Sequence, residues 1–534
     1  MFRRWFFASL FGAAALAASA TVWWPGAAPR RNVILLTVES TRADMVRPDT
    51  APNLLAAADG ALRFQQHRAI SGWTAPNIVA LLTGLDAYEN GIHASGDTVP
   101  RDRDLPLQAL SRQGWRVSGL QAFMRIDQFQ HLGLLVEPGE ALLPWLGGRV
   151  LDGKPFFLWY HYLETHLPYA PGPDFMPDWK SLLPPGDNAA IDRVEAAGRQ
   201  PSVPAGSVAF KPSDRAAIVA LHEATLREFD AWFGRFWQFF QASGLAENTI
   251  LVLTADHGEE HLERGLVGHA STTHQAQLHE EIVRLPLFVW LPRDMQQPPQ
   301  MVASPSDHRD VLPSLLAWLG QAPKTDIPLL DQAPHAWRAL TSQAGFAEPD
   351  PDQVRTFVAA RIEGDWKRIE RRVDGKLVAA QLYHLPSDPG EHYDRSAERP
   401  DIAARLAEAM LRDFAARRID TRVANLPAEP GAAPRWQMPA GSQALRFADI
   451  AGGIRLAWSG DATARYVLEY EAGDGGAMSL KGRLDVLGLE KDFGRIDEAY
   501  WRSYVLPYGK VRLRVGLAGR NDAWSDWIEV RALP

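Results

Sequence analysis

The chain contains no cysteine among its 534 residues. This absence excludes disulfide bonds, thiolate metal ligands and a cysteine nucleophile, together with any cofactor made by modifying cysteine. The sequence also lacks an excess of basic residues, because 56 Lys and Arg stand against 64 Asp and Glu and leave a net charge of −8. Nucleic-acid-binding proteins are usually basic, so we expect no nucleic-acid partner.

The rest of the composition is that of a folded globular protein. Hydrophobic residues make up 46% of the chain and charged residues 22%, which excludes wholesale disorder. The length allows one large domain with a sizeable core, together with one or two smaller pieces.

The N-terminus has the pattern of an export signal. Arg3 and Arg4 precede an apolar run over residues 5–24, which contains the cleavage-like triplet at residues 18–20. The run is also long enough to span a bilayer. We expect residues 1–28 to be a signal peptide or a membrane anchor, and the remainder to lie in the periplasm, secreted or anchored to the inner membrane. A buried N-terminal helix is the structural alternative.

Unbroken apolar runs between residues 29 and 420 predict the fold of the main domain. Runs that do not alternate are typical of strands buried on both faces, so we predict an α/β domain with a mostly parallel sheet flanked by helices. The runs cover residues 32–38, 156–160, 249–253 and 285–291.

One long helix is expected between the second and third of these runs. Ser213 or Asp214 can cap its start, and Gly244 stands where it should end. Its apolar stripe is expected to face the core and comprises Ile218, Leu221, Leu226, Phe229, Phe233 and Phe236.

The C-terminal part differs in kind from the main domain. Residues 421–442 are rich in proline and predict a linker. Residues 443–534 contain short segments that alternate with period two, which predicts a small all-β sandwich. This stretch resembles a fibronectin type III module.

Acidic side chains follow two of the predicted strands. Glu39 and Asp256 each come after an apolar run, and His257 is next to Asp256. The carboxyl ends of parallel strands meet at one edge of a sheet, so these side chains should lie close together. Two carboxylates and an imidazole suit a divalent cation. The alternative for a single strand-end carboxylate is simple exposure to solvent.

A hydroxyl is expected at the start of a helix. Pro76 suits the first turn and Gly84 the end of this helix, which places Thr74 at its N-terminus, where backbone N–H groups favour an anion. A hydroxyl becomes an effective nucleophile when a metal binds it. A helix cap is the alternative interpretation of Thr74.

Several segments in order resemble the sulfatase-like members of the alkaline phosphatase superfamily. The resemblance implies a sulfatase-like catalytic domain over residues 29–420. The matching segments are residues 32–44, 74–84, 254–260 with Gly268-His269, 310–316 and 382–391.

Three departures from the sulfatase pattern carry information. Thr74 stands where sulfatases carry the cysteine or serine that becomes formylglycine, so we expect no formylglycine. Ile78 replaces an arginine, and Glu39 replaces the usual aspartate. The set is similar to that of lipoteichoic acid synthases and phosphoethanolamine transferases. It implies a Thr74 nucleophile and one divalent ion (Mn, Zn, Mg or Ca) bound by Glu39, Thr74, Asp256 and His257.

The same resemblance suggests roles for other side chains. His269 is expected to bind a non-bridging oxygen or to protonate the leaving group. His166, His161 and Trp73 are expected on the substrate side, with core packing as the alternative for Trp73. We interpret three further histidines as structural: His261, His274 and His279. No second set of Asp and His ligands is evident in the sequence.

These inferences predict an exported, metal-dependent hydrolase that cleaves phosphoester or phosphodiester bonds, with sulfate esters as a further option. One alternative is a phosphoethanolamine- or phosphoglycerol-type transferase that modifies cell-envelope glycan or lipid. Another is an inactive sulfatase fold that works as a binding protein. The expected partner is a phosphoester-bearing small molecule, lipid or glycan of the envelope, and residues 5–24 are a possible membrane anchor.

Overall fold

The computed structural model describes most of residues 31–533, and the expected signal or anchor segment lies outside the described residues. Within the described part, no helix combines the length and apolarity needed to cross a membrane. Residues not described inside this range are 87–88, 91, 93–98, 100–104, 121–131, 138–141, 201–202, 204–205, 270–277, 296–299, 322–326, 331–336, 343–355, 374–375, 417–429, 451–453, 463, 474–479, 495–500, 502–505, 507–508, 518–519 and 521.

The main domain is built on an eight-stranded sheet with the order β12-β2-β11-β7-β1-β6-β4-β5. The strands from β7 to β5 run parallel, which confirms the mostly parallel α/β fold. The strand bounds are β1 Asn32–Val38, β2 Leu62–Phe64, β4 Arg116–Leu120, β5 Leu135–Glu137, β6 Phe156–Tyr162, β7 Thr249–Ala255, β11 Leu287–Trp290 and β12 Gln300–Val302.

The fourth apolar run does not form one parallel strand. Pro286 separates β10 (Arg284–Leu285) from β11, and β11 lies antiparallel to β7. β10 pairs instead with β3 (His67–Arg68), which also pairs with β13 (Ser306–Asp307) in a small second sheet. A proline cannot donate to a strand ladder, so the break falls at this residue.

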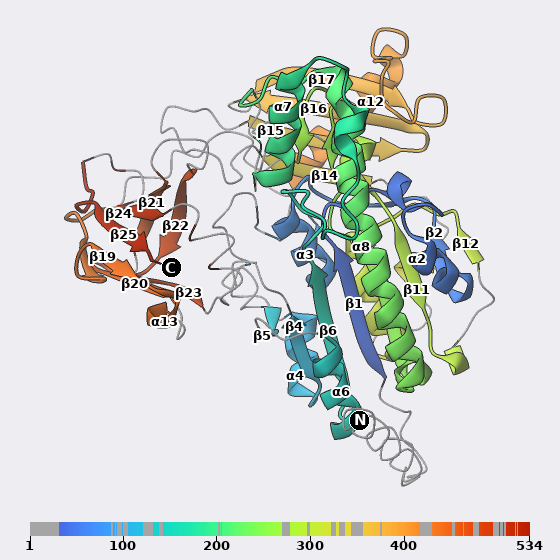
Figure 1. The fold of residues 1–534 in the computed structure, drawn as a ribbon, viewed down its shortest axis with the longest axis horizontal. Helices are drawn as coiled ribbons and strands as arrows, with labels where there is room; N and C mark the ends of the chain where they lie inside the picture. The colour runs from blue at the N-terminus through green and yellow to red at the C-terminus, as the bar shows by residue number, and fades with distance from the viewer. Residues whose placement is uncertain are drawn as a thin grey trace.

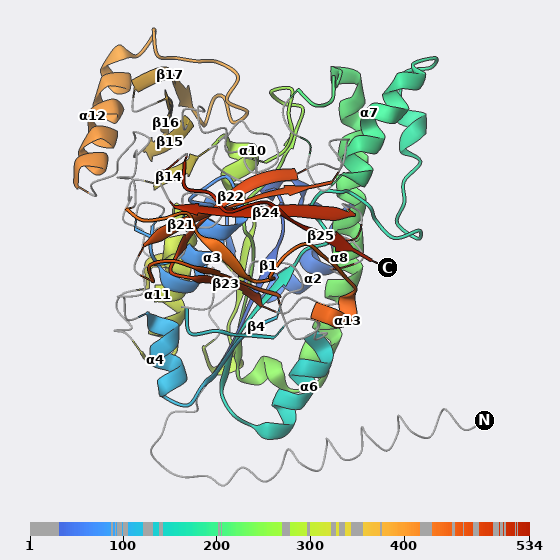
Figure 2. The same cartoon turned by 90° about the vertical axis from the view of Figure 1, so that its left-hand side faces the viewer.

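Helices cover both faces of the main sheet, as Figures 1 and 2 show. Alternate residues of β1 enter two separate hydrophobic clusters, which explains why its sequence is apolar without alternation. One face packs against α3 (Thr74–Thr83), α4 (Pro106–Arg112) and α11 (His308–Trp318). The other face packs against α2 (Pro52–Ala57), α6 (Leu142–Asp152) and α8 (Arg215–Ala242).

The long expected helix is confirmed as α8, which has 28 residues. All six residues of its predicted apolar stripe are buried. Gly244 adopts φ +78° just beyond the end of the helix, in the left-handed region that glycine enters at little cost. Near its N-terminal half, α8 also packs with α7 (Asn188–Arg199) around a smaller hydrophobic cluster.

A four-stranded antiparallel sheet lies at one end of the main sheet in Figures 1 and 2, with α12 (Pro400–Ala416) beside it. It was not anticipated from the sequence, and it carries part of the C-terminal segment that resembles the family. Its strands are β14 Trp337–Ser342, β15 Thr356–Glu363, β16 Trp366–Val373 and β17 Lys376–His384.

A buried ion network connects this sheet to the main domain. Lys367 on β16 is fully buried, and its Nζ lies 3.0 Å from Glu280 Oε1 and 2.9 Å from Glu391 Oε1. Arg68 on β3 is a second cation in this network, and its Nη2 lies 2.9 Å from Glu280 Oε2. Burial alone would raise the pKa of Glu280, but Arg68 and Lys367 outweigh it and hold that pKa well below its ordinary value.

The described C-terminal residues form two sheets that share one hydrophobic cluster, which contains Trp458 and Tyr466. The expected strands are present, although β19 and β25 pair in parallel. The sandwich and its fibronectin-like character stay predictions, and β18 begins inside the expected linker. One sheet contains β18 Arg435–Met438, β20 Ile454–Ser459 and β23 Glu490–Gly494, and the other β19 Gln443–Leu445, β21 Arg465–Ala472, β22 Leu480–Leu487, β24 Lys510–Leu517 and β25 Ile528–Ala532.

We predict that Lys367→Ala destabilises the main domain strongly. Removing one partner of a buried ion pair typically costs about 3–5 kcal/mol, because the remaining charge has no compensation. Urea denaturation should report this loss in the free energy of unfolding. Lys376→Ala, at an exposed position on β17, is the matched control and should change it by less than about 0.5 kcal/mol. Equal effects of the two changes would contradict the role given to the network.

Candidate functional site

Glu39 and Asp256 meet at the carboxyl edge of the sheet, as the sequence predicts. β1 and β7 pair in parallel with Val38 opposite Ala255, so the residues that follow are neighbours. The backbone N–H groups of Ser40 and His257 both donate to Asp256 Oδ1, at 3.0 and 2.9 Å. Ser40 adopts φ +53°, which turns the chain directly after Glu39.

Thr74 is the first residue of α3, as predicted. Its Oγ1 donates to Glu39 Oε1 at 3.1 Å and lies 3.2 Å from His257 Nε2. Asn77 holds the preceding loop in place, since its Oδ1 accepts from the backbone of residues 70 and 71 and its Nδ2 donates to the carbonyls of residues 71 and 73. The loop and the helix start therefore fix the hydroxyl against Glu39 and His257.

His161 on β6 lies on the opposite side of Glu39. Its Nε2 is 2.6 Å from Glu39 Oε2, and its Nδ1 is 2.7 Å from Thr37 Oγ1. Thr37 Oγ1 in turn accepts from Trp159 Nε1 at 2.9 Å. The structure thus places His161 in direct contact with an expected metal ligand, whereas its expected role in substrate binding stays a prediction.

The electrostatics of this cluster follow from burial and mutual contact. Burial would raise the pKa of Glu39, but hydrogen bonds from His161 and His257 hold it well below its ordinary value. Burial raises the pKa of Asp256 to about 6, with a further contribution from the charge of Glu39. Burial would lower the pKa of His257, but Asp256 and Glu39 raise it to about 10. The cluster therefore attracts positive charge.

These residues fit a divalent cation. Among the described residues, Asp256 Oδ2 is buried with no hydrogen-bond partner, although it lies 3.2 Å from His257 Nε2. His257 Nε2 is also 3.1 Å from Glu39 Oε1 and 3.2 Å from Thr74 Oγ1. Oxygen and nitrogen ligands about 2.0–2.2 Å from one ion lie roughly 3 Å apart. All four predicted ligands are therefore brought together.

His269 and His166 lie beside this cluster. The ring of His269 is 4.1 Å from that of His257 and 5.3 Å from that of His166. His269 Nδ1 lies 3.1 Å from Glu259 Oε1. Burial and the positive charge of His257 hold the pKa of His269 well below its ordinary value, so its ring is neutral. Glu259 was not singled out from the sequence, although its place two residues after His257 was a usable signal.

Other residues singled out from the sequence are buried away from this cluster. Trp73 is 4% exposed and belongs to the main core, so its predicted contact with substrate stays a prediction. Ile78 is fully buried in the same core. His261 Nε2 lies 2.7 Å from His222 Nδ1, and His279 contacts the ring of Tyr383. The predicted structural residue His274 lies outside the described residues.

The loop that carries Asp256 and His257 rests directly on α10 (Glu280–Val283). Gly258 N donates to Ile282 O at 2.6 Å, and Glu259 N donates to Glu281 O at 3.0 Å. A Cβ atom at residue 258 would lie 2.0 Å from Glu281 O. Only glycine permits this approach, so the sequence Asp-His-Gly is required by packing as well as by chemistry.

The fold is similar to that of sulfatases. A central, mostly parallel sheet with helices on both faces and the buried cluster at its carboxyl edge is a mixed α/β fold of the sulfatase-like type. The sulfatase family model matches residues 139–321, a stretch that includes Asp256, His257 and His269 but not Glu39 or Thr74. Over that stretch the chain is therefore similar to sulfatases, and its fold is like theirs.

Curated and solved proteins are similar to this chain over longer stretches. The chain is 24% identical over 315 residues to a multifunctional alkaline phosphatase superfamily protein, PehA, of Trinickia caryophylli, covering 54% of this chain and 59% of that protein. It is 20% identical over 439 residues to an N-acetylglucosamine-6-O-sulfatase of Bacteroides thetaiotaomicron, covering 64% and 77%. The phosphonate monoester hydrolase from Silicibacter pomeroyi superposes with TM-score 0.55 at 17% identity, covering 74% and 97%.

We predict that Glu39→Ala removes one equivalent of divalent metal from the purified protein and leaves the fold intact. Glu39 bridges His161, His257 and Thr74, whereas a single strand-end carboxylate contributes little to the core. Elemental analysis should show the loss, and circular dichroism should show an unchanged spectrum. Unchanged metal content in this variant would show that Glu39 is not a ligand.

Metal affinity should rise with pH. His257 must lose its proton to bind a cation, and with a pKa of about 10 it is protonated throughout the neutral range. Affinity should therefore increase by up to about tenfold per pH unit below pH 10, with release of about one proton. Calorimetry in buffers of different ionisation enthalpy measures this proton. The folding stability of the metal-free protein should change in the opposite direction and fall with rising pH. The stability contributed by charged His257 is lost as pH rises through about 10.

Proposed function

We propose that this chain is a metal-dependent hydrolase of phosphoester or phosphodiester bonds that uses Thr74 as its nucleophile. One observation carries the proposal: Thr74 Oγ1 lies at the start of a helix, 3.1 Å from Glu39 Oε1 and 3.2 Å from His257 Nε2. A hydroxyl in that position can bind the same cation as Glu39 and His257. A bound divalent cation supplies positive charge that lowers the pKa of the hydroxyl and polarises the phosphoryl oxygens.

In the first step Thr74 Oγ1 attacks phosphorus. The hydroxyl proton passes to solvent, the Thr74 O–P bond forms, the bond from phosphorus to the leaving oxygen breaks, and that oxygen takes up a proton from solvent and leaves as an alcohol. The backbone N–H groups at the start of α3 favour the negative charge on the phosphoryl oxygens. Asn77 assists by holding the loop before Thr74 in one conformation, so the hydroxyl is oriented before substrate binds.

In the second step water releases the phosphoryl group from Thr74. Because Nδ1 of His269 faces Glu259, a proton on Nδ1 leaves the lone pair on Nε2. Neutral His269 can then accept a proton from the attacking water through Nε2 while the P–O bond to Thr74 breaks. That proton passes on through solvent to Thr74 Oγ1, so the hydroxyl is restored and His269 is neutral again. This role develops the expectation that His269 is catalytic, and His166 beside it remains our candidate for substrate contact.

Two considerations favour phosphorus over sulfur. Threonine cannot be converted to formylglycine, and structural neighbours include proteins named as phosphonate monoester hydrolases. Sulfate-ester cleavage is the second candidate, because curated relatives include an N-acetylglucosamine-6-O-sulfatase and arylsulfatase A of Homo sapiens. The periplasmic location and the envelope-derived substrate remain part of this proposal.

We predict that Thr74→Ala lowers kcat/KM for an aryl phosphodiester or phosphonate monoester by at least about 1000-fold, as loss of a covalent nucleophile does. Thr74→Ser should retain measurable activity, since it keeps the hydroxyl. Mass spectrometry of the acid-quenched wild-type protein should find a phosphoryl group on Thr74. Full activity in Thr74→Ala would overturn the mechanism.

The same assay separates the alternatives. A hydrolase releases one free phosphate or phosphonate product per alcohol released, whether or not a second alcohol is present. A transferase requires an acceptor alcohol and forms a new ester with it. A binding protein with an inactive fold would show neither product with any metal, and Thr74→Ala would then change nothing.

A further inference from the structure

A second cluster of potential ligands lies directly after the Asp256–Glu259 loop in the sequence and includes residues of α10, on which that loop rests. Glu260 belongs to β8 (Glu260–His261), His279 caps the N-terminus of α10, and Glu281 lies within α10. One ligand atom from each of the three lies within 4.8 Å of the other two. All three residues are buried, with exposed fractions of 1%, 3% and 7%.

The polar atoms of this cluster are poorly satisfied by the protein itself. Within the described part of the chain, neither carboxylate oxygen of Glu260 and neither ring nitrogen of His279 has a hydrogen-bond partner. Leaving such groups buried without partners costs several kcal/mol in general. The side chains are close together, yet no pair of them is hydrogen bonded, so their spacing leaves room for an atom between them.

The neighbouring cation does not account for all of the charge. Arg264 forms an ion pair with Glu281 and donates to the carbonyls of Gly390 and Glu391. Arg264 and Arg42 both act on Glu260, but Arg264 is paired with Glu281 and Arg42 with Asp44 and Glu263. Burial raises the pKa of Glu260 to about 8, so a protonated, neutral Glu260 is the competing explanation, which the experiment below tests.

We propose that Glu260, His279 and Glu281 bind a structural divalent cation, separate from the one expected at Glu39. Metal–ligand bonds of about 2.0–2.6 Å place ligand atoms roughly 3–5 Å apart, in agreement with the observed spacing. A carboxylate has two oxygens, so Glu281 can keep Arg264 on one and offer the other to the ion. Two carboxylates with one imidazole favour Zn²⁺ or Mn²⁺ over Ca²⁺ or Mg²⁺.

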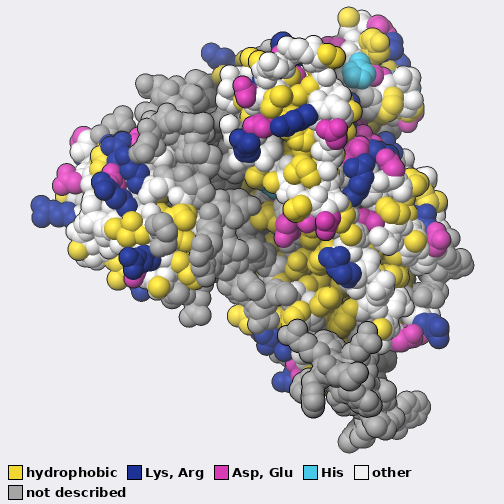
Figure 3. All heavy atoms as spheres, in the orientation of Figure 1, with side chains coloured by type: hydrophobic (Ala, Val, Ile, Leu, Met, Phe, Trp, Pro, Cys, Tyr) yellow, Lys and Arg dark blue, Asp and Glu magenta, His cyan; other side chains and the backbone are white. Residues whose placement is uncertain are grey.

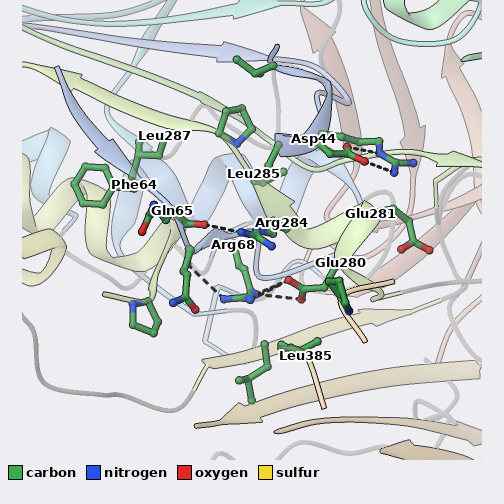
Figure 4. Close-up of a pocket in the computed structure, with 18 of the residues that line it drawn as sticks. Asp44, Phe64, Gln65, Arg68, Glu280, Glu281, Arg284, Leu285, Leu287 and Leu385 are labelled. Carbon is green, nitrogen blue, oxygen red and sulfur yellow. Dashed lines mark hydrogen bonds and ion pairs between the residues drawn. The ribbon is translucent and has the colours of Figure 1, made fainter. Parts of the chain in front are cut away.

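One of the three proposed ligands lines a cavity. Glu281 lies on the wall of a cavity of about 1050 Å³, also lined by Arg68, Glu280 and Arg284, and Figure 4 shows its carboxylate on that wall, away from the Arg68–Glu280 pair. Glu281 O also accepts from Glu259 N in the loop that carries Asp256 and His257. An ion here would tie that loop to α10 without contacting the substrate.

The test is metal stoichiometry of the full chain, made metal-free with a chelator, reloaded with Zn²⁺ and passed through gel filtration. We expect two equivalents in the wild type, one in Glu260→Gln, one in Glu39→Ala and none in the double variant. Glu370→Gln removes a carboxylate that is equally buried but paired with Arg368 and Arg372. This matched control should keep both equivalents.

Thermal melting supplies an independent readout. In the Glu39→Ala background, added Zn²⁺ should raise Tm, and this shift should disappear when Glu260→Gln or His279→Asn is added. His279→Asn replaces Glu260→Gln in both measurements if the latter fails to fold. Wild-type metal content in Glu260→Gln and His279→Asn would overturn the proposal and leave Glu260 as a neutral acid. Loss of the metal ion at Glu39 alone, or loss of activity in Thr74→Ala, tests the proposed function. Neither result bears on the site formed by Glu260, His279 and Glu281.

Discussion

The arrangement of residues at the carboxyl edge of the main sheet depends on the compensation of two carboxylates that have been removed from water, Glu39 and Asp256. A buried carboxylate is costly unless charges or hydrogen bonds balance it. His161 and His257 meet Glu39 from two sides, and two backbone N–H groups meet Asp256. Much of the local geometry serves this balance, including the left-handed turn at Ser40 and the glycine that lets the His257 loop touch α10. The same balance leaves a concentration of donor atoms that suits a cation.

The parts of this arrangement that depend on local sequence could be predicted. An unbroken apolar run followed by an acidic residue indicates a buried strand and a functional edge, and both Glu39 and Asp256 were found in this way. Pro76 in the first turn of α3 and Gly84 just after its end predicted that Thr74 lies at the start of this helix. Seven of the eight strands of the main sheet run in the same direction and only β11 opposes them, which agrees with the apolar runs at its centre that are buried on both faces.

The parts that depend on distant pairing could not be predicted. β14 to β17 mix charged and apolar residues without a regular period, and a charged residue such as Lys367 normally indicates a surface. Only the presence of Glu280 and Glu391 explains why it is buried. His161 lies within an apolar strand, and its contact with Glu39 depends on the register between β1 and β6. The charge pattern of the visible face is mixed, with both signs interspersed among the described residues in Figure 3, and offers no guide to these internal pairs.

The pairing of β1 between β6 and β7 has a consequence for how the protein is made. Glu39 follows the first strand, whereas Asp256 and His257 follow a strand that lies more than two hundred residues later in the chain. During synthesis β1 can pair with β6 long before β7 exists. The other edge of β1 therefore stays unpaired until β7 has been made. Late closure of this kind slows folding and exposes the nascent chain to mispairing. The order of translation, rather than the chemistry of the cluster, therefore sets the moment at which Glu39, Asp256 and His257 can first come together.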